Sequence, residues 1–198
     1  MVDVAKNLLA IKAQLPEGVE LTAVSKFHPD EYITAAYNVG QRIFGESHEQ
    51  ELARKAASLP KDIHWHFIGH LQTNKVKYIA PYISMIESVD SIRLLREIEK
   101  QGARCGRRIR VLLELHIAEE ATKYGLTPDD CRSLLADGEW QQMEHVEICG
   151  LMMMASHTDD HDQIAREMDT AHSFFDEVRA KYFADQPSFR YRSWGMSD

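Results

Sequence analysis

Short apolar runs alternate with longer stretches of helical period along the whole chain. The apolar runs predict strands at residues 21–25, 42–45, 64–69, 85–89, 109–117, 146–153 and 189–194. An amphipathic N-terminal segment and the stretches between these runs predict helices, the latter at 30–39, 46–59, 74–79, 91–100, 128–136 and 164–183. Asp90 and Thr127 are the expected N-caps of two of them. This strict alternation implies right-handed crossovers and a parallel sheet.

Two architectures fit such a sheet, an open doubly wound sheet and a closed barrel. Neither GxGxxG nor GxxxxGK[ST] follows the first strand, and unusual polar residues follow several strands, which favours the barrel. A parallel barrel closes with eight strands, whereas the sequence stops directly after the seventh. We therefore expect residues 1–198 to form a single α/β domain, and the pattern leaves two readings: a fold other than a barrel, or a barrel that is incomplete in this sequence.

Composition narrows the function classes. The 198 residues are 44% hydrophobic, as in ordinary globular domains, and the formal net charge of −8 disfavours nucleic-acid binding. The N-terminal segment has no continuous apolar region or cleavage site of a signal peptide, and nothing else approaches a membrane span. The three cysteines lack paired spacing, which indicates a reducing compartment. A cytoplasmic protein is the simplest expectation.

Lys26 ends the first predicted strand, and alternation places it on the same side as Thr22 and Val24. If that side is the barrel interior, the amine meets a partly dry cavity. Desolvation favours a neutral amine, which is the form that attacks an aldehyde to give an imine. An ordinary lysine leaving a strand for solvent fits the same pattern.

A second candidate is the Gly195-Met196-Ser197 turn after the seventh strand. A glycine lets the backbone approach a ligand closely, and adjacent N–H and hydroxyl groups can bind an anion. Phosphate sites of barrels are often built from the loops after strands seven and eight. A plain turn is the alternative. Met152, in the sixth strand, is expected to fill the barrel interior.

A third candidate is the histidine group formed by His64, His66 and His70, which share one side of the third strand. An HxH pair on a barrel strand can form half of a metal site, so a metal-dependent hydrolase competes with the other hypotheses. Against it, His64 and His66 lie at the start of their strand, whereas barrel chemistry gathers at the carboxyl ends. His70, at the far end, is the better site candidate.

Together these segments resemble the pyridoxal 5'-phosphate (PLP) homeostasis family, the alanine-racemase-like N-terminal group also called proline synthetase co-transcribed homologues. The similarity covers essentially the whole chain. Its motifs are AVSK at 23–26, FGES at 44–47, HFIGHLQTNK at 66–75, SVDS at 88–91, HIAEEATKYG at 116–125, GLMMMAS at 150–156 and WGMSD at 194–198. Each is weak alone, but all occur in the family's order.

The resemblance implies a single (β/α)8 TIM-type barrel like the amino-terminal domain of alanine racemase, with the eighth strand and final helix missing from residues 1–198. By the same resemblance, PLP is held as a Schiff base (covalent imine) on Lys26. It also implies that Ser193, Gly195, Met196 and Ser197 hold the cofactor phosphate, together with elements of an eighth strand. We expect the cofactor-binding residues to be Lys26, Val24, Ser47, His70, Met152, Ser193, Gly195, Met196 and Ser197. Two positions depart from the family, which usually has asparagine at Ser47 and methionine at Trp194.

A racemase needs a second acid or base opposite the imine, and alanine racemases draw it largely from another domain and a partner subunit. Tyr124 or His70 could take that role. We favour a non-enzymatic carrier, a monomer that buffers PLP and contacts PLP-dependent apo-enzymes transiently, with neither nucleic acid nor membrane as partner. The alternatives are a PLP-dependent amino-acid racemase and the metal-dependent hydrolase using His64 and His66.

Overall fold

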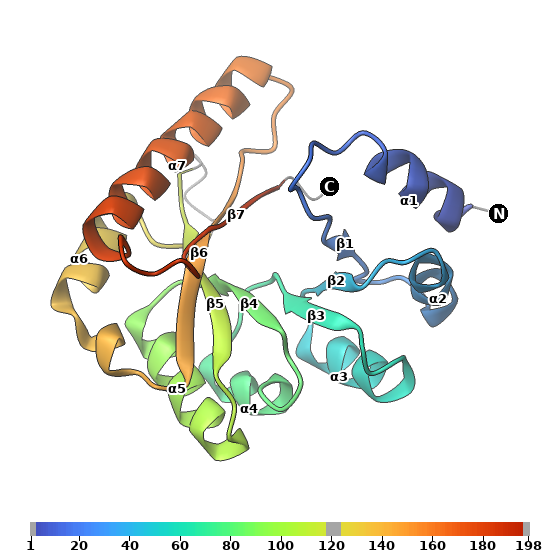
Figure 1. The fold of residues 1–198 in the computed structure, drawn as a ribbon, viewed down its shortest axis with the longest axis horizontal. Helices are drawn as coiled ribbons and strands as arrows, with labels where there is room; N and C mark the ends of the chain where they lie inside the picture. The colour runs from blue at the N-terminus through green and yellow to red at the C-terminus, as the bar shows by residue number, and fades with distance from the viewer. Residues whose placement is uncertain (1–2, 118–123, 196–198) are drawn as a thin grey trace.

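The computed structural model describes residues 3–117 and 124–195 and contains one parallel sheet. Its strands pair in sequence order, each parallel to the next (Figure 1). They are β1 (Ala23–Val24), β2 (Ile43–Glu46), β3 (His64–Phe67), β4 (Met85–Val89), β5 (Ile109–Leu115), β6 (Val146–Met154) and β7 (Tyr191–Gly195). All seven predicted strands are present, so the expected parallel sheet is confirmed.

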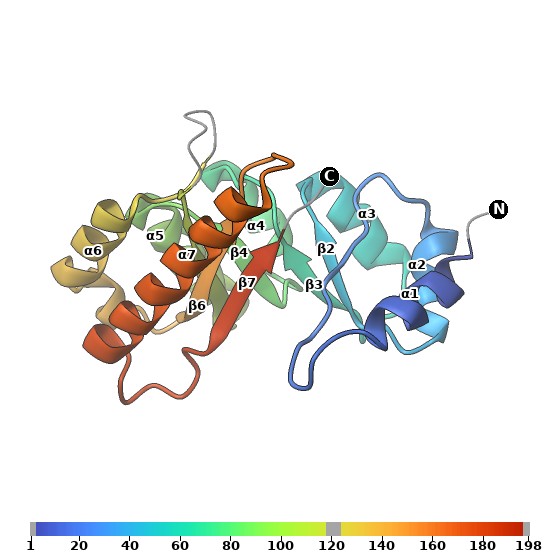
Figure 2. The same cartoon turned by 90° about the horizontal axis from the view of Figure 1, so that it is seen from above.

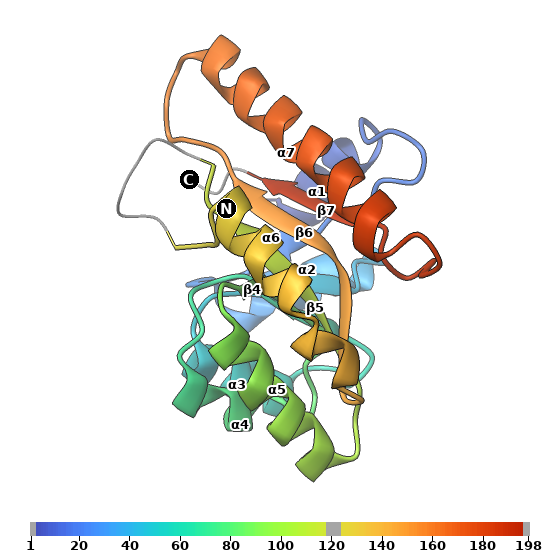
Figure 3. The same cartoon turned by 90° about the vertical axis from the view of Figure 1, so that its left-hand side faces the viewer.

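One helix precedes β1, the others lie between successive strands, and together they cover the outer face of the sheet (Figures 1 and 3). They are α1 (Val4–Lys12), α2 (Asp30–Asn38), α3 (Glu49–Ser58), α4 (Val76–Ile79), α5 (Ile92–Cys105), α6 (Pro128–Asp137) and α7 (His161–Tyr182), with 3-10 helices at Thr73–Lys75 and Glu139–Gln142. In the described part of the chain, no helix combines the length and the apolar character that a membrane crossing requires.

The sheet curls into a half-barrel whose edge strands are β1 and β7 (Figures 1 and 2). Its outer face and the helices bury one large core, to which Phe44, Trp65 and Val111 contribute. The inner face carries a smaller apolar cluster of Met85, Leu112, Cys149 and Met152. Two-residue alternation separates these faces, except in β6, where a register shift against β5 places Cys149 and Met152, three positions apart, in the same cluster.

The residues that cap the helices confirm one of the two expected N-caps and correct the other. Thr127 caps α6 as expected, because its side chain accepts a hydrogen bond from the Asp130 N–H. The prediction for Asp90 is wrong, since Ser91 caps α5 by accepting from the Leu94 N–H. Helix α5 also continues to Cys105, where Gly106 ends it in the left-handed conformation that glycine tolerates (φ 61°).

Candidate functional site

A cavity of about 560 Å³ lies inside the half-barrel, between β1 with its preceding loop and the ends of β6 and β7. Its volume is in the range of small-molecule sites, roughly 300–1,000 Å³. Six of the expected cofactor-binding residues line it. They are Lys26, Val24, Ser47, Met152, Ser193 and Gly195. Residues near β1 and residues of β7, the two edge strands, thus meet in one cavity because the sheet curls.

Lys26 lies two residues beyond the end of β1 and lines the cavity together with Thr22 and Val24. The three share one side because successive residues of a strand point to opposite faces. Lys26 is half-buried, whereas its neighbour Ser25 is buried on the other side. The structure therefore places the amine-bearing side chain in the barrel interior and not on the helix-covered face.

A hydrogen-bonded chain crosses the interior from β3 to β7. His66 Nδ1 lies 2.5 Å from Glu87 Oε1, and the Ser193 hydroxyl donates to Glu87 Oε2 over 2.6 Å. His66 and Glu87 are both buried. Each oxygen of the Glu87 carboxylate therefore has a partner, which is what burial of a carboxylate requires. This chain fixes the Ser193 hydroxyl at the cavity wall.

Two glycines shape the cavity. A Cβ on Gly69 would lie 2.8 Å from the Cα and the carbonyl oxygen of Ser47, so only glycine lets these two segments pack together. At Gly195 a Cβ would meet nothing within 4 Å, so open space lies beside the backbone there. Trp194 also lines the cavity, and its partly buried ring packs against the large core.

Of the three remaining expected residues, only His70 is described, and it lies elsewhere. His70 lines a separate rim cavity with Asp90, its Nδ1 3.4 Å from Asp90 Oδ2. Its ring stacks on Tyr124 with centroids 3.9 Å apart. Met196 and Ser197 lie outside the described residues. Neither His70 nor Tyr124 is among the residues that line the Lys26 cavity.

The histidines considered for a metal site do not converge. His64 is exposed at the start of β3, whereas His66 is buried and bound to Glu87. Within residues 3–117 and 124–195, no group of three or more His, Cys, Asp or Glu side chains has a geometry that could hold a metal ion. The geometry thus offers His66 a carboxylate partner in place of a metal.

Glu87 is the site residue that sequence analysis missed. Its signal was a charged side chain two positions after Met85 in an otherwise apolar strand, which places it on the inner face. Its partners could not be predicted, because His66 and Ser193 come from strands separated from it by 21 and 106 positions.

Glu114, on β5, is a second buried carboxyl, and burial together with the charge of Asp90 raises its pKa to about 7. The folded protein therefore holds a proton that the unfolded chain releases near pH 4.5, so stability falls as the pH rises from about 5 to about 7. We expect Glu114→Gln to remove this fall, which amounts to about 3 kcal/mol. Urea unfolding of both proteins at pH 5 and pH 8 measures it; parallel pH profiles would contradict the assignment.

Comparison with known proteins decides the family. The family model described as "Alanine racemase, N-terminal domain" matches residues 2–198. A pyridoxal phosphate homeostasis protein of Helicobacter pylori strain 26695 is 33% identical over 91% of this chain and 78% of its own length. The chain belongs to the pyridoxal phosphate homeostasis family. The homeostasis protein of Schizosaccharomyces pombe is 37% identical over 70% of this chain, and that match spans only 58% of the yeast protein.

Solved structures agree with this family assignment. PipY of Synechococcus elongatus PCC7942, solved without PLP, superposes with a TM-score of 0.86 at 30% identity, over 98% of this chain and 96% of PipY. The PipY structure with PLP bound gives a TM-score of 0.83 over the same shares. An alanine racemase of Clostridium difficile 630 gives 0.73 at 15% identity, over 98% of this chain and 53% of the racemase, which shows the fold alone. The homeostasis family and alanine racemase therefore share this barrel architecture.

Proposed function

We propose that this chain binds PLP covalently through Lys26 and serves to hold and deliver the cofactor. The relatives named pyridoxal phosphate homeostasis proteins and the PipY structure with PLP bound support the cofactor. The observation that carries the proposal is the placement of Lys26, Ser193 and Gly195 in one cavity. They provide an amine for the aldehyde, and a hydroxyl and an open backbone for the phosphate.

The donor set of the cavity fits the cofactor. Lys26 provides its only lysine amine among the described lining residues, and Ser47 and Ser193 provide hydroxyl groups. The open space at Gly195 lets an anionic group approach the backbone of β7. When bound, PLP supplies an electrophilic aldehyde, and the protein's part is to bind, orient and shelter it.

Glu87 sets a condition on phosphate binding. The Ser193 hydroxyl has a single proton to donate, and in the structure it goes to Glu87 Oε2. If Ser193 is to bind a phosphate oxygen, its hydroxyl has to turn away from Glu87. The carboxylate and the phosphate therefore compete for one donor, which moderates affinity as a protein that releases its cofactor requires.

A carrier fits the cavity better than a racemase does. Glu87 has both oxygens engaged, and the Nδ1 of His66 is paired with it. His70 and Tyr124, the earlier candidates for the acid or base, stack on one another at a different cavity. We propose a non-enzymatic role on this ground. Interconversion of alanine enantiomers by the purified protein would favour the racemase instead.

The proposal includes the cellular compartment and the oligomeric state of the protein. Cys131 and Cys149 are buried free thiols, and burial raises the pKa of each to about 12, which keeps them unreactive. Free thiols suit a reducing compartment, so we place the protein in the cytoplasm. We propose a monomer that transfers PLP to apo-enzymes during transient contacts.

Trapping the covalent bond tests the proposed function directly. The protein is mixed with PLP, reduced with borohydride and digested, and its peptides are analysed by mass spectrometry. We expect one stoichiometric adduct, on Lys26, because this amine alone faces the sheltered cavity among the described lining residues. Addition of pyridoxine 5'-phosphate, which lacks the aldehyde, should reduce the yield by competition. Labelling spread over surface lysines would reject the proposal.

A further inference from the structure

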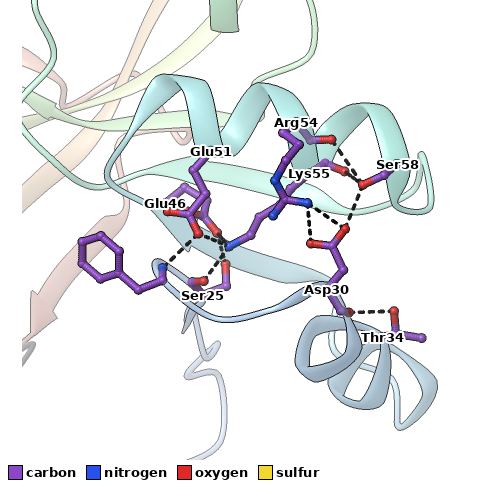
Figure 4. Close-up of polar contacts among 9 residues, drawn as sticks. Ser25, Asp30, Thr34, Glu46, Glu51, Arg54, Lys55 and Ser58 are labelled. Atoms are coloured by element: carbon purple, nitrogen blue, oxygen red, sulfur yellow. Dashed lines mark hydrogen bonds and ion pairs between the residues drawn. The ribbon is translucent and has the colours of Figure 1, made fainter.

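A buried lysine lies on the opposite face of the sheet from the cavity. Lys55, on α3, is completely buried, and its Nζ donates to three oxygens (Figure 4). The distances are 2.7 Å to the Ser25 carbonyl, 2.8 Å to Glu46 Oε1 and 2.6 Å to Glu51 Oε1. An ammonium has three N–H donors, so each has a partner and the charge is matched by carboxylates.

These contacts reach the backbone on both sides of Lys26. The Ser25 carbonyl, which Lys55 binds directly, belongs to the peptide group that precedes the Lys26 Cα. Glu51 Oε1, which Lys55 also binds, accepts the Phe27 N–H over 2.9 Å, and that N–H belongs to the peptide group that follows. Of the two peptide groups that flank the Lys26 Cα, one is thus bound to the Lys55 ammonium directly and the other through Glu51.

The same network restrains two further groups beside Lys26. The Ser25 hydroxyl donates to Glu46 Oε1 over 2.5 Å. Phe27 has a φ of 64°, and it is the only non-glycine with positive φ in residues 3–117 and 124–195. This conformation is costly for a bulky side chain and persists only where the surroundings impose it. Phe27 is 75% exposed, so its own burial contributes little to holding this turn.

Charge distribution in the network favours a fixed geometry. Burial raises the pKa of Glu46, although hydrogen bonds from Lys55 and Ser25 act in the opposite direction. Burial also opposes ionisation of Glu51, but hydrogen bonds and the charge of Lys55 lower its pKa overall. Separation of Lys55 from Glu46 and Glu51 would leave the two carboxyls without their cation. That separation is costly at a buried site, so the three side chains are held in one arrangement.

We propose that Lys55 is a positioning residue for Lys26: its ammonium fixes the two flanking peptide groups and so directs the Lys26 amine into the cavity. The inference rests on the proposed function and adds to it. Condensation forms a bond between Lys26 Nζ and the aldehyde carbon, and the aldehyde oxygen leaves as water with two amine hydrogens. Its rate depends on how often the amine is presented at the aldehyde, which a loose backbone would reduce.

Variants of the network test the inference. Lys55→Met removes the ammonium at similar length, and Glu51→Ala removes the bridge to Phe27 together with one of the three acceptors of the Lys55 ammonium. We expect both to slow covalent attachment of PLP about 10-fold or more, with affinity for pyridoxine 5'-phosphate changed less than about twofold, because that probe does not need the amine. Amide hydrogen exchange at Phe27, followed by NMR without cofactor, should accelerate in both.

Arg54→Ala is the matched control. Arg54 lies beside Lys55 on α3 and binds Asp30 over 2.9 Å without contacting the backbone around Lys26 (Figure 4). We expect its attachment rate to equal that of the unchanged protein. Should Lys55→Met not fold, Glu51→Ala decides alone. Unchanged rates in the folded network variants, or an equal loss in Arg54→Ala, would overturn the inference. Failure of the unchanged protein to bind PLP covalently would instead reject the proposed function.

Discussion

Lys26→Ala is expected to abolish covalent attachment of PLP and to weaken its binding about 100-fold or more, equivalent to about 3 kcal/mol. The remaining affinity comes from the hydroxyl groups and the open backbone of the cavity, which the substitution leaves in place. Absorption spectroscopy during a PLP titration measures the effect, because attachment to an amine shifts the absorption of PLP to longer wavelength. Affinity for pyridoxine 5'-phosphate should stay nearly unchanged.

Lys100→Ala provides the control for removal of a lysine. Lys100 lies on α5 with an exposed side chain and contacts Glu97 on the same helix, away from the cavity. The titration of this variant should match that of the unchanged protein. If Lys26→Ala instead binds PLP as tightly and with the same spectrum as Lys100→Ala, the attachment site proposed here is wrong.

Gly150→Ala is expected to destabilise the fold by about 3 kcal/mol or more. Gly150 pairs with Tyr191 across β6 and β7, and a Cβ there would overlap the Tyr191 carbonyl oxygen and lie 2.7 Å from its carbon. Because the clashing atoms belong to the Tyr191 backbone, β7 itself has to move. The φ of 157° at Gly150 adds strain for any other residue. Because β7 carries Ser193 and Gly195, PLP binding should weaken too. Urea denaturation gives the stability change.

Gly195→Ala separates this clash from a general effect of removing glycine. Its Cβ would meet nothing within 4 Å, so we expect the free energy of unfolding to change by less than about 0.5 kcal/mol. A similar stability for the Gly150 and Gly195 variants would show that β7 accommodates the added methyl group without moving.

The inner face of the sheet was predictable where two-residue alternation alone decides it. Alternation placed Lys26 on the same side as Thr22 and Val24 but left open whether that side faces the interior, and the structure puts all three at the cavity. The same rule places Glu87 on the side of Met85. The buried hydrogen-bond network of Lys55 was harder to predict from the sequence. Lys55 is three positions from Leu52 on α3, so both share a face, yet a lysine at such a position ordinarily reaches solvent.

The sequence by itself determined the order of strands and helices, the parallel sheet and the grouping of Lys26 with Thr22 and Val24 on one side of its strand, because these follow from periodicity over a few neighbouring residues. Only the tertiary structure decided which side chains meet. The curl of the sheet brings Ser193 to Glu87, places His70 beside Asp90 outside the Lys26 cavity, and buries Lys55 against the backbone of Ser25. These contacts join segments far apart in the chain, and local pattern carries no information about such distances.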